Sequence, residues 1–100
     1  MISRFLEKRV EIELEEPGRK PGNTIELEYY LLENEAAENE SGSSFGVEIR
    51  EKNQGVINET KNYFNIYSNR EDTLNLVRKL AFNTVTPSTL PYILDDILGT

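Results

Sequence analysis

Two groups of carboxylates are the side chains whose type and spacing come closest to a reactive site in this sequence. Asp95 and Asp96 are adjacent near the C-terminus, and four glutamates run from Glu33 to Glu40. Paired carboxylates can bind Mg²⁺ or Ca²⁺ or transfer protons. Neighbouring residues of a helix point about 100° apart, however, and the glutamates lack the spacing of a calcium-binding loop. We therefore expect solvated carboxylates and no metal site.

The side chains that most often serve as catalytic nucleophiles and bases are missing. The sequence contains no His and no Cys, and no serine stands in a Gly-x-Ser-x-Gly turn. It also has no glycine-rich motif for cradling phosphates. An enzyme would have to use Ser, Tyr, Lys or carboxylates. We expect no enzymatic activity and no cofactor.

Tyrosines are the most distinctive binding residues, because five occur in a chain of 100 residues that has no Trp. The tyrosine ring suits protein interfaces because it buries a large area at a low entropic cost. The sequence predicts a protein-contact surface, with an apolar patch on the outer face of a sheet. Its candidate residues are Tyr30, Leu32, Tyr63, Tyr67 and Tyr92. The alternative is that the tyrosines are ordinary half-buried strand residues.

The charge distribution argues against polyanionic partners. The net charge is −7, and seven acidic residues but no basic ones lie from Glu26 to Glu48. Such a chain repels nucleic acid and anionic lipid. The last third resembles two helices joined by a turn, but the second helix offers only Asp95 and Asp96 as charges, which argues against DNA binding. We expect no nucleic-acid partner.

Membrane and secretion signals are also missing from the sequence. It has no apolar stretch of 18 residues and no secretory signal at its N-terminus. The lack of Cys suits a reducing compartment. We therefore expect a cytoplasmic protein without a membrane partner.

The elements that must position these residues begin with four strands. Apolar and polar residues alternate from residue 10, over 24–33, over 45–50 and towards the end of 56–67. Two Pro-Gly pairs within 16–23 predict a hairpin loop, and the acidic stretch 34–44 predicts a mobile loop. The expected inner face of the sheet consists of Val10, Ile12, Leu14, Ile25, Leu27, Tyr29, Leu31, Phe45, Val47, Ile49, Phe64 and Ile66.

Two helices follow, over about 69–84 and 88–98. Ser68 and Glu71 have the spacing of a capping box, Thr86 or Ser88 can cap the second helix, and Gly99 stands where a C-terminal cap belongs. The fold class is therefore α+β: a four-stranded antiparallel meander followed by two C-terminal helices packed on one face (ββββαα). One domain spans 1–100, with its sheet over about 4–67.

Four segments of the chain resemble a small uncharacterised family of clostridial (Firmicute) proteins. They are Glu28–Glu33, Phe45–Ile49, Asn83–Leu90 and Leu94–Leu98, and the tail of the form Asn-x-Val-Thr-Pro is the most specific. The resemblance covers Tyr29 to Leu98 and implies a bacterial protein without an assigned activity.

For function, the sequence favours a small protein–protein interaction or regulatory module, with self-association as one form. The alternative is a small-ligand-binding domain or enzyme that uses the cleft between sheet and helices. Thr86 and Ser88 would then hold an anion at a helix N-terminus.

Overall fold

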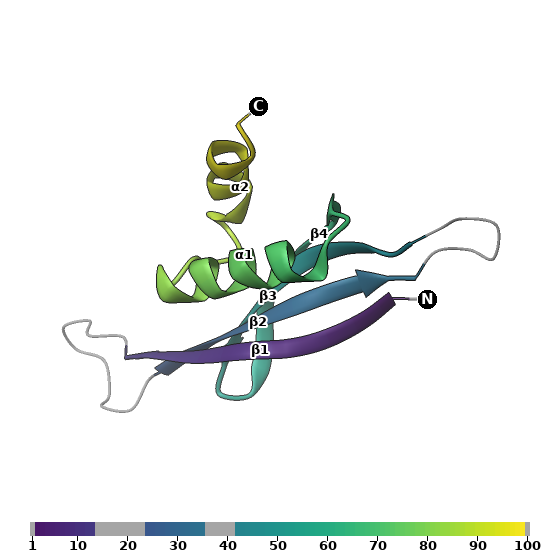
Figure 1. Cartoon of the computed structure of the whole chain (residues 1–100). Coiled ribbons are helices and arrows are strands. Elements are labelled where there is room, and N and C mark those ends of the chain that lie inside the picture. Colours follow the sequence, from purple (N-terminus) through teal and green to yellow (C-terminus); the bar gives the residue numbers. More distant parts are fainter. Residues whose placement is uncertain (1, 14–23, 36–41, 100) are drawn as a thin grey trace.

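The computed structural model describes residues 2–13, 24–35 and 42–99. The chain forms strands β1 (Ile2–Glu13), β2 (Thr24–Asn34), β3 (Ser44–Asn53) and β4 (Val56–Tyr67), then helices α1 (Arg70–Phe82) and α2 (Leu90–Leu98). The strands lie in the order β1-β2-β3-β4, each antiparallel to its neighbour. The predicted α+β meander is confirmed (Figure 1).

Some predictions concern parts of the chain outside this description. The hairpin loop at 16–23 and the core residue Leu14 lie outside the described residues, as does most of the predicted mobile loop. The ends of that loop are strand instead, because Asn34 closes β2 and Ser44 opens β3, and the two are paired.

The helices cover one face of the sheet, which we call the inner face. In Figure 1, α1 lies along this face and α2 rises steeply away from it. The core between sheet and helices is apolar apart from the hydroxyls of Tyr29 and Thr73. It consists of Leu27, Tyr29, Leu31, Phe45, Val47, Ile49, Leu76, Val77, Leu80, Ala81, Val85, Leu90 and Leu94. None of the described helices is long and apolar enough to cross a bilayer.

Tyr29 is the polar link through this core. Its side chain is fully buried, and its hydroxyl donates a hydrogen bond of 2.8 Å to the carbonyl oxygen of Val85, in the connection between the helices. Burial raises the pKa of Tyr29 to about 12.

The start of α1 differs by one residue from the predicted capping box. Asn69, not Ser68, is the cap, because its extended backbone turns its side-chain oxygen towards the first helical turn. That oxygen accepts hydrogen bonds from the backbone N–H groups of Glu71, at 2.8 Å, and Asp72, at 3.2 Å.

The connection between the helices is longer than predicted. Thr84 takes a left-handed conformation with φ 53°, and the N–H of Val85 binds the carbonyl oxygen of Leu80, which ends α1 as a Schellman-type turn. A further turn at 86–89 precedes α2, whose cap residue Thr89 makes no side-chain capping bond. The predicted caps at Thr86 and Ser88 are therefore wrong. The predicted cap at Gly99 is confirmed.

The end of β4 faces the opposite way from the prediction. Tyr63 pairs with Val47, and Tyr67 pairs with Phe45, so both tyrosines lie on the inner face and pack against the core. Phe64, predicted to be in the core, is exposed. The reason is the register with β3. A shift of one residue between Ile57 and Glu59 places the odd-numbered residues from Glu59 to Tyr63 on the inner face, and a bulge of two extra residues before Tyr67 keeps Tyr67 on that face as well.

The backbone accommodates this bulge at two positions. Asn65 adopts φ 57° within it, and Ile66 still reaches the core. Opposite the bulge, a Cβ atom added at Gly46 would lie 2.0 Å from the carbonyl oxygen of Tyr63. The two strands approach so closely that only glycine fits there.

Candidate functional site: the charged outer face of the sheet

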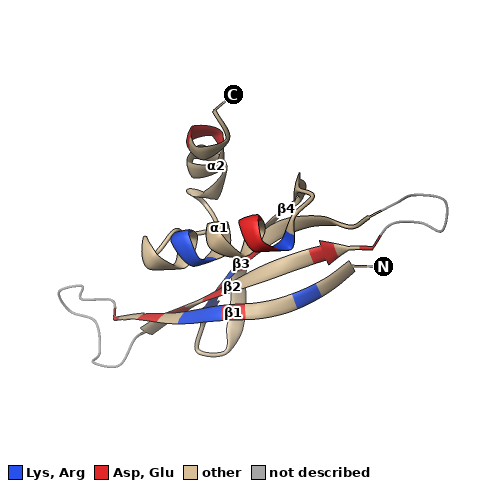
Figure 2. Ribbon diagram, viewed as in Figure 1, with Lys and Arg blue, Asp and Glu red and all other residues tan. Residues whose placement is uncertain are grey.

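The face of the sheet opposite the helices, here called the outer face, carries a bonded set of charged and polar side chains. We name this set the outer charge layer, and all four strands contribute to it. It consists of Arg4, Arg9, Glu26, Glu28, Tyr30, Glu48, Arg50, Lys52 and Asn62. Figure 2 shows both signs of charge on β1.

Glu48 organises one end of the layer. Only 1% of this residue is exposed. Its Oε1 atom accepts hydrogen bonds from Arg4 Nε, at 3.3 Å, and from Asn62 Nδ2, at 3.2 Å. Its Oε2 atom accepts one of 2.8 Å from Arg50 Nε. A single buried carboxylate therefore joins β1, β3 and β4.

Glu28 organises the other end and is 2% exposed. Lys52 Nζ lies 3.1 Å from it, the hydroxyl of Tyr30 donates to it at 2.9 Å, and Arg9 Nη2 donates at 3.2 Å. Burial opposes ionisation, but the hydrogen bonds from Lys52, Tyr30 and Arg9 outweigh it, so the pKa of Glu28 lies below its usual range. Arg9 also pairs with Glu26.

Tyr30 connects the two ends. The guanidinium of Arg50 lies over its ring, 4.7 Å from the centroid, in a cation–π contact. Burial first, and then the hydrogen bond to the Glu28 carboxylate, raise the pKa of the Tyr30 hydroxyl. The ring of Tyr30 therefore contacts Arg50, and its hydroxyl donates a hydrogen bond to Glu28.

The five candidate contact residues do not form one surface. Tyr30 and Leu32 share the outer face as predicted, but Leu32 is only 1% exposed and offers no contact area. Tyr63 and Tyr67 lie on the inner face, because they pair with Val47 and Phe45 of β3. Tyr92 is exposed on α2. The predicted apolar patch is replaced by a charged layer.

Sequence reasoning missed the charged members of this layer, although a signal was present. In a four-stranded meander the second and third strands are central, so their polar positions face each other across the middle of the sheet. Glu28 on β2 pairs with Arg50 on β3, and Glu26 pairs with Lys52. Opposite charges at paired positions of central strands indicate a bonded layer.

Four of the carboxylates considered first lie among the described residues. Asp95 and Asp96 are exposed on α2, Glu33 lies in β2 and Glu35 directly follows that strand, whereas Glu38 and Glu40 lie outside the described residues. Within residues 2–13, 24–35 and 42–99, no three acidic side chains form a metal-binding group.

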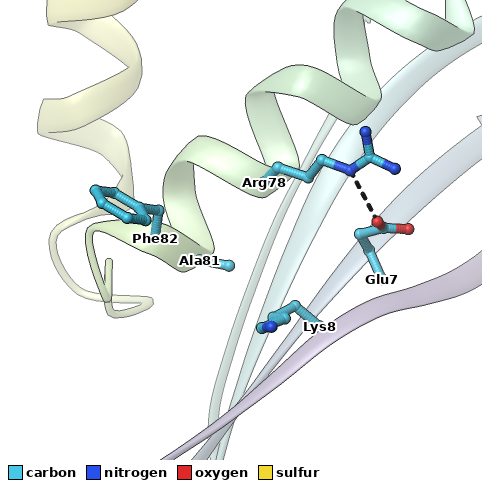
Figure 3. A pocket seen from close by; sticks show the side chains of 5 residues that line it. All are labelled: Glu7, Lys8, Arg78, Ala81 and Phe82. Carbon is cyan, nitrogen blue, oxygen red and sulfur yellow. Dashed lines mark hydrogen bonds and ion pairs between the residues drawn. The ribbon is translucent and has the colours of Figure 1, made fainter.

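The cleft between sheet and helices contains a cavity of about 350 Å³ (Figure 3). It lies between β1 and α1 and is lined by Glu7, Lys8, Arg78, Ala81 and Phe82. Arg78 Nε binds Glu7 Oε1 at 3.0 Å along one side, and the ring of Phe82 is exposed at the other end.

A second cavity, of about 430 Å³, lies between the two helices and includes Thr84 and Thr89 in its lining. Thr86 and Ser88, the hydroxyls predicted to hold an anion, are hydrogen-bonded to each other and do not line either cavity.

Comparison with known proteins identifies the family of the chain but assigns it no function. The chain matches no curated protein and no solved structure. A family of unknown function, DUF6514, matches residues 8–100, which extends well before the Tyr29 boundary of the resemblance in the sequence. The match covers β2 to β4, both helices and the second half of β1. The chain therefore belongs to the family of unknown function DUF6514.

Proposed function

We propose that this chain is a protein-interaction module whose contact surface is the outer face of the sheet. The observation that carries the proposal is the outer charge layer itself. Both described helices pack on the inner face, so the layer lies on a face that no described helix covers. Arginine and tyrosine are the residue types that most often dominate binding energy at interfaces.

The bonding of the layer supports this role because it orders side chains before a partner arrives. Glu48 holds two arginines, and the Tyr30 ring holds one of them a second time. A long side chain that is already ordered loses less entropy on binding. Burying two glutamates on a sheet face costs desolvation energy. A face that only contacts solvent has no need of buried glutamates, so their presence supports a role for this face in binding.

Site-specific cross-linking in the native cell tests the proposal. A photo-reactive amino acid replaces Thr60, which is exposed on the outer face opposite Arg50, or Leu6, which is exposed opposite Tyr30. Matched controls carry it at Phe82 or Tyr92, both exposed on the helices. We expect a defined cross-linked protein from the two outer-face positions and none from the controls.

The cross-linked protein must then bind the purified chain directly. A binding constant for that purified partner that weakens at least about tenfold in a Tyr30→Ala variant supports the outer face. Cross-links only from Phe82 or Tyr92 would assign the contact to the helical side and overturn the proposal. Cross-links to a second copy of the chain would identify the interaction as self-association.

A second candidate function uses the cavity between β1 and α1. Its volume of about 350 Å³ falls in the range of small-ligand sites, and Lys8 and Arg78 supply cationic groups for an acidic ligand. Native mass spectrometry of freshly purified protein tests this candidate. A small molecule lost on Arg78→Gln would favour it, and apo protein throughout would remove it.

Further parts of the proposal come from the sequence. We infer a cytoplasmic protein of clostridial origin that does not catalyse a reaction. The lack of His and Cys supports the last point.

A further inference from the structure

The guanidinium groups of Arg4 and Arg50 share one carboxylate and keep their outer nitrogens available. Both bind Glu48 through Nε. Among the described residues, no hydrogen bond engages Nη1 or Nη2 of either arginine. Their side chains are 41% and 27% exposed. Two planar donor groups, one on β1 and one on β3, therefore remain open to a ligand.

Charge is unevenly distributed along the outer face. Two arginines share Glu48 at this end, which leaves one net positive charge there. Towards the other end, Glu11 and Glu26 occupy paired positions on β1 and β2. The Arg4–Arg50 end is thus a cationic spot on a chain whose net charge is −7.

We infer that the Arg4–Arg50 end of the outer charge layer binds a carboxylate in an extended, acidic segment of a partner protein. The inference rests on the proposed use of the outer face. A guanidinium fork matches the two oxygens of a carboxylate, and such charge-assisted pairs are roughly twice as strong as neutral hydrogen bonds. Glu48 and the Tyr30 ring already orient the Arg50 guanidinium.

The surroundings of the two arginines favour a peptide segment of mixed character. Ile2 and Leu6, on either side of Arg4 in β1, are both exposed and contribute apolar area to the same face. An extended segment that alternates acidic and apolar residues would meet both kinds of surface.

Long polyanions fit this spot less well than a short segment. Duplex DNA carries one charge per about 1.7 Å of its axis and would meet the negative remainder of the molecule. At physiological salt, electrostatic interactions between exposed charges are screened beyond about 8 Å. A short acidic segment bound at this spot therefore interacts mainly with the nearby arginines and little with the more distant negative charges.

Titration of the intact, ¹⁵N-labelled protein with a synthetic peptide of alternating glutamate and valine tests the inference. The arginine Nε–H signals in the NMR spectrum are the readout. We expect saturable shifts of the Arg4 and Arg50 signals. The same peptide with glutamine in place of glutamate should produce no such shifts.

Two substitutions with the same change of charge distinguish binding at the Arg4–Arg50 end from a nonspecific effect of net charge on peptide binding. Arg4→Gln should weaken binding of the glutamate peptide at least about tenfold. Lys61→Gln, at an exposed position on the inner face of β4 opposite Ile49, should leave it within about twofold. If Arg4→Gln fails to fold, the comparison of glutamate and glutamine peptides on the unchanged protein decides the question alone.

Any one of the following results would overturn the inference. Equal shifts with the glutamine peptide, or equal weakening by Lys61→Gln, would mean that the two guanidinium groups do not recognise carboxylate. Full displacement by equimolar inorganic phosphate would indicate a general anion site. A concentration-dependent dimer, detected by light scattering and abolished by Arg4→Gln, would assign the spot to a second copy. A partner cross-linked at Thr60 without any binding of the acidic peptide would leave the proposed function standing and remove only this inference.

Discussion

Tyr29 shows how much one side chain can contribute to joining two layers of the fold. Its hydroxyl supplies a hydrogen bond to the buried carbonyl oxygen of Val85. Tyr29→Phe leaves that oxygen without this donor, and we expect a loss of about 1–2 kcal/mol in the free energy of unfolding. Urea denaturation measures the loss. Tyr92→Phe is the matched control, because Tyr92 is exposed on α2. Equal effects of the two substitutions would contradict the assigned bond.

The same residue predicts a loss of stability at alkaline pH. Tyr29 has a pKa of about 12 in the folded state, because burial raises it above the ordinary tyrosine value of 10.0. Because the folded state keeps the proton longer, its contribution is complete below about pH 10 and is lost as the pH rises through about 12. Unfolding curves recorded across this window should fall less steeply for Tyr29→Phe than for the unchanged protein.

At the scale of elements, the residue that caps the start of α1 differs from the one that the sequence pattern predicts. Asn69 caps the helix, whereas the pattern favours Ser68. We expect Asn69→Ala to lower the free energy of unfolding by about 1 kcal/mol, because two backbone N–H groups lose their acceptor. Thermal melts followed by circular dichroism give the comparison. Ser68→Ala should melt like the unchanged protein, and the reverse order would place the cap at Ser68.

At the scale of the whole molecule, the outer charge layer joins all four strands across the sheet. The pKa of Glu28 is lowered in the folded state, since the hydrogen bonds from Lys52, Tyr30 and Arg9 exceed the effect of burial. Its contribution to stability is therefore complete above the ordinary carboxylate pKa of 4.5 and is lost as the pH falls through the lower, folded value.

Acid denaturation measures this contribution. Glu28→Gln should flatten the loss of stability below about pH 4.5 and lower stability at neutral pH, because three donors lose a charged acceptor. Glu11→Gln, an exposed position on the same face, should leave both features unchanged. An identical acid profile for Glu28→Gln and the unchanged protein would contradict the role of this carboxylate.

The sequence predicted the elements well because their signals are local. Alternation over 24–33 and 45–50, the period of the two helices and the Gly99 cap each depend on residues within a few positions of one another. The meander followed from short connections between strands that alternate in polarity. The site was predicted only in part, through the position of Tyr30 on the outer face.

The sequence by itself therefore determined the order of elements, the fold class and the inner positions of β2 and β3, since backbone geometry and local burial patterns specify them. Only the tertiary structure decided the positions of Tyr63, Phe64 and Tyr67, because they depend on the register in which β4 pairs with β3 and on the bulge opposite Gly46. The outer charge layer depends likewise on strand register. Residues 44 positions apart, such as Arg4 and Glu48, become partners only when the sheet brings them within hydrogen-bonding distance.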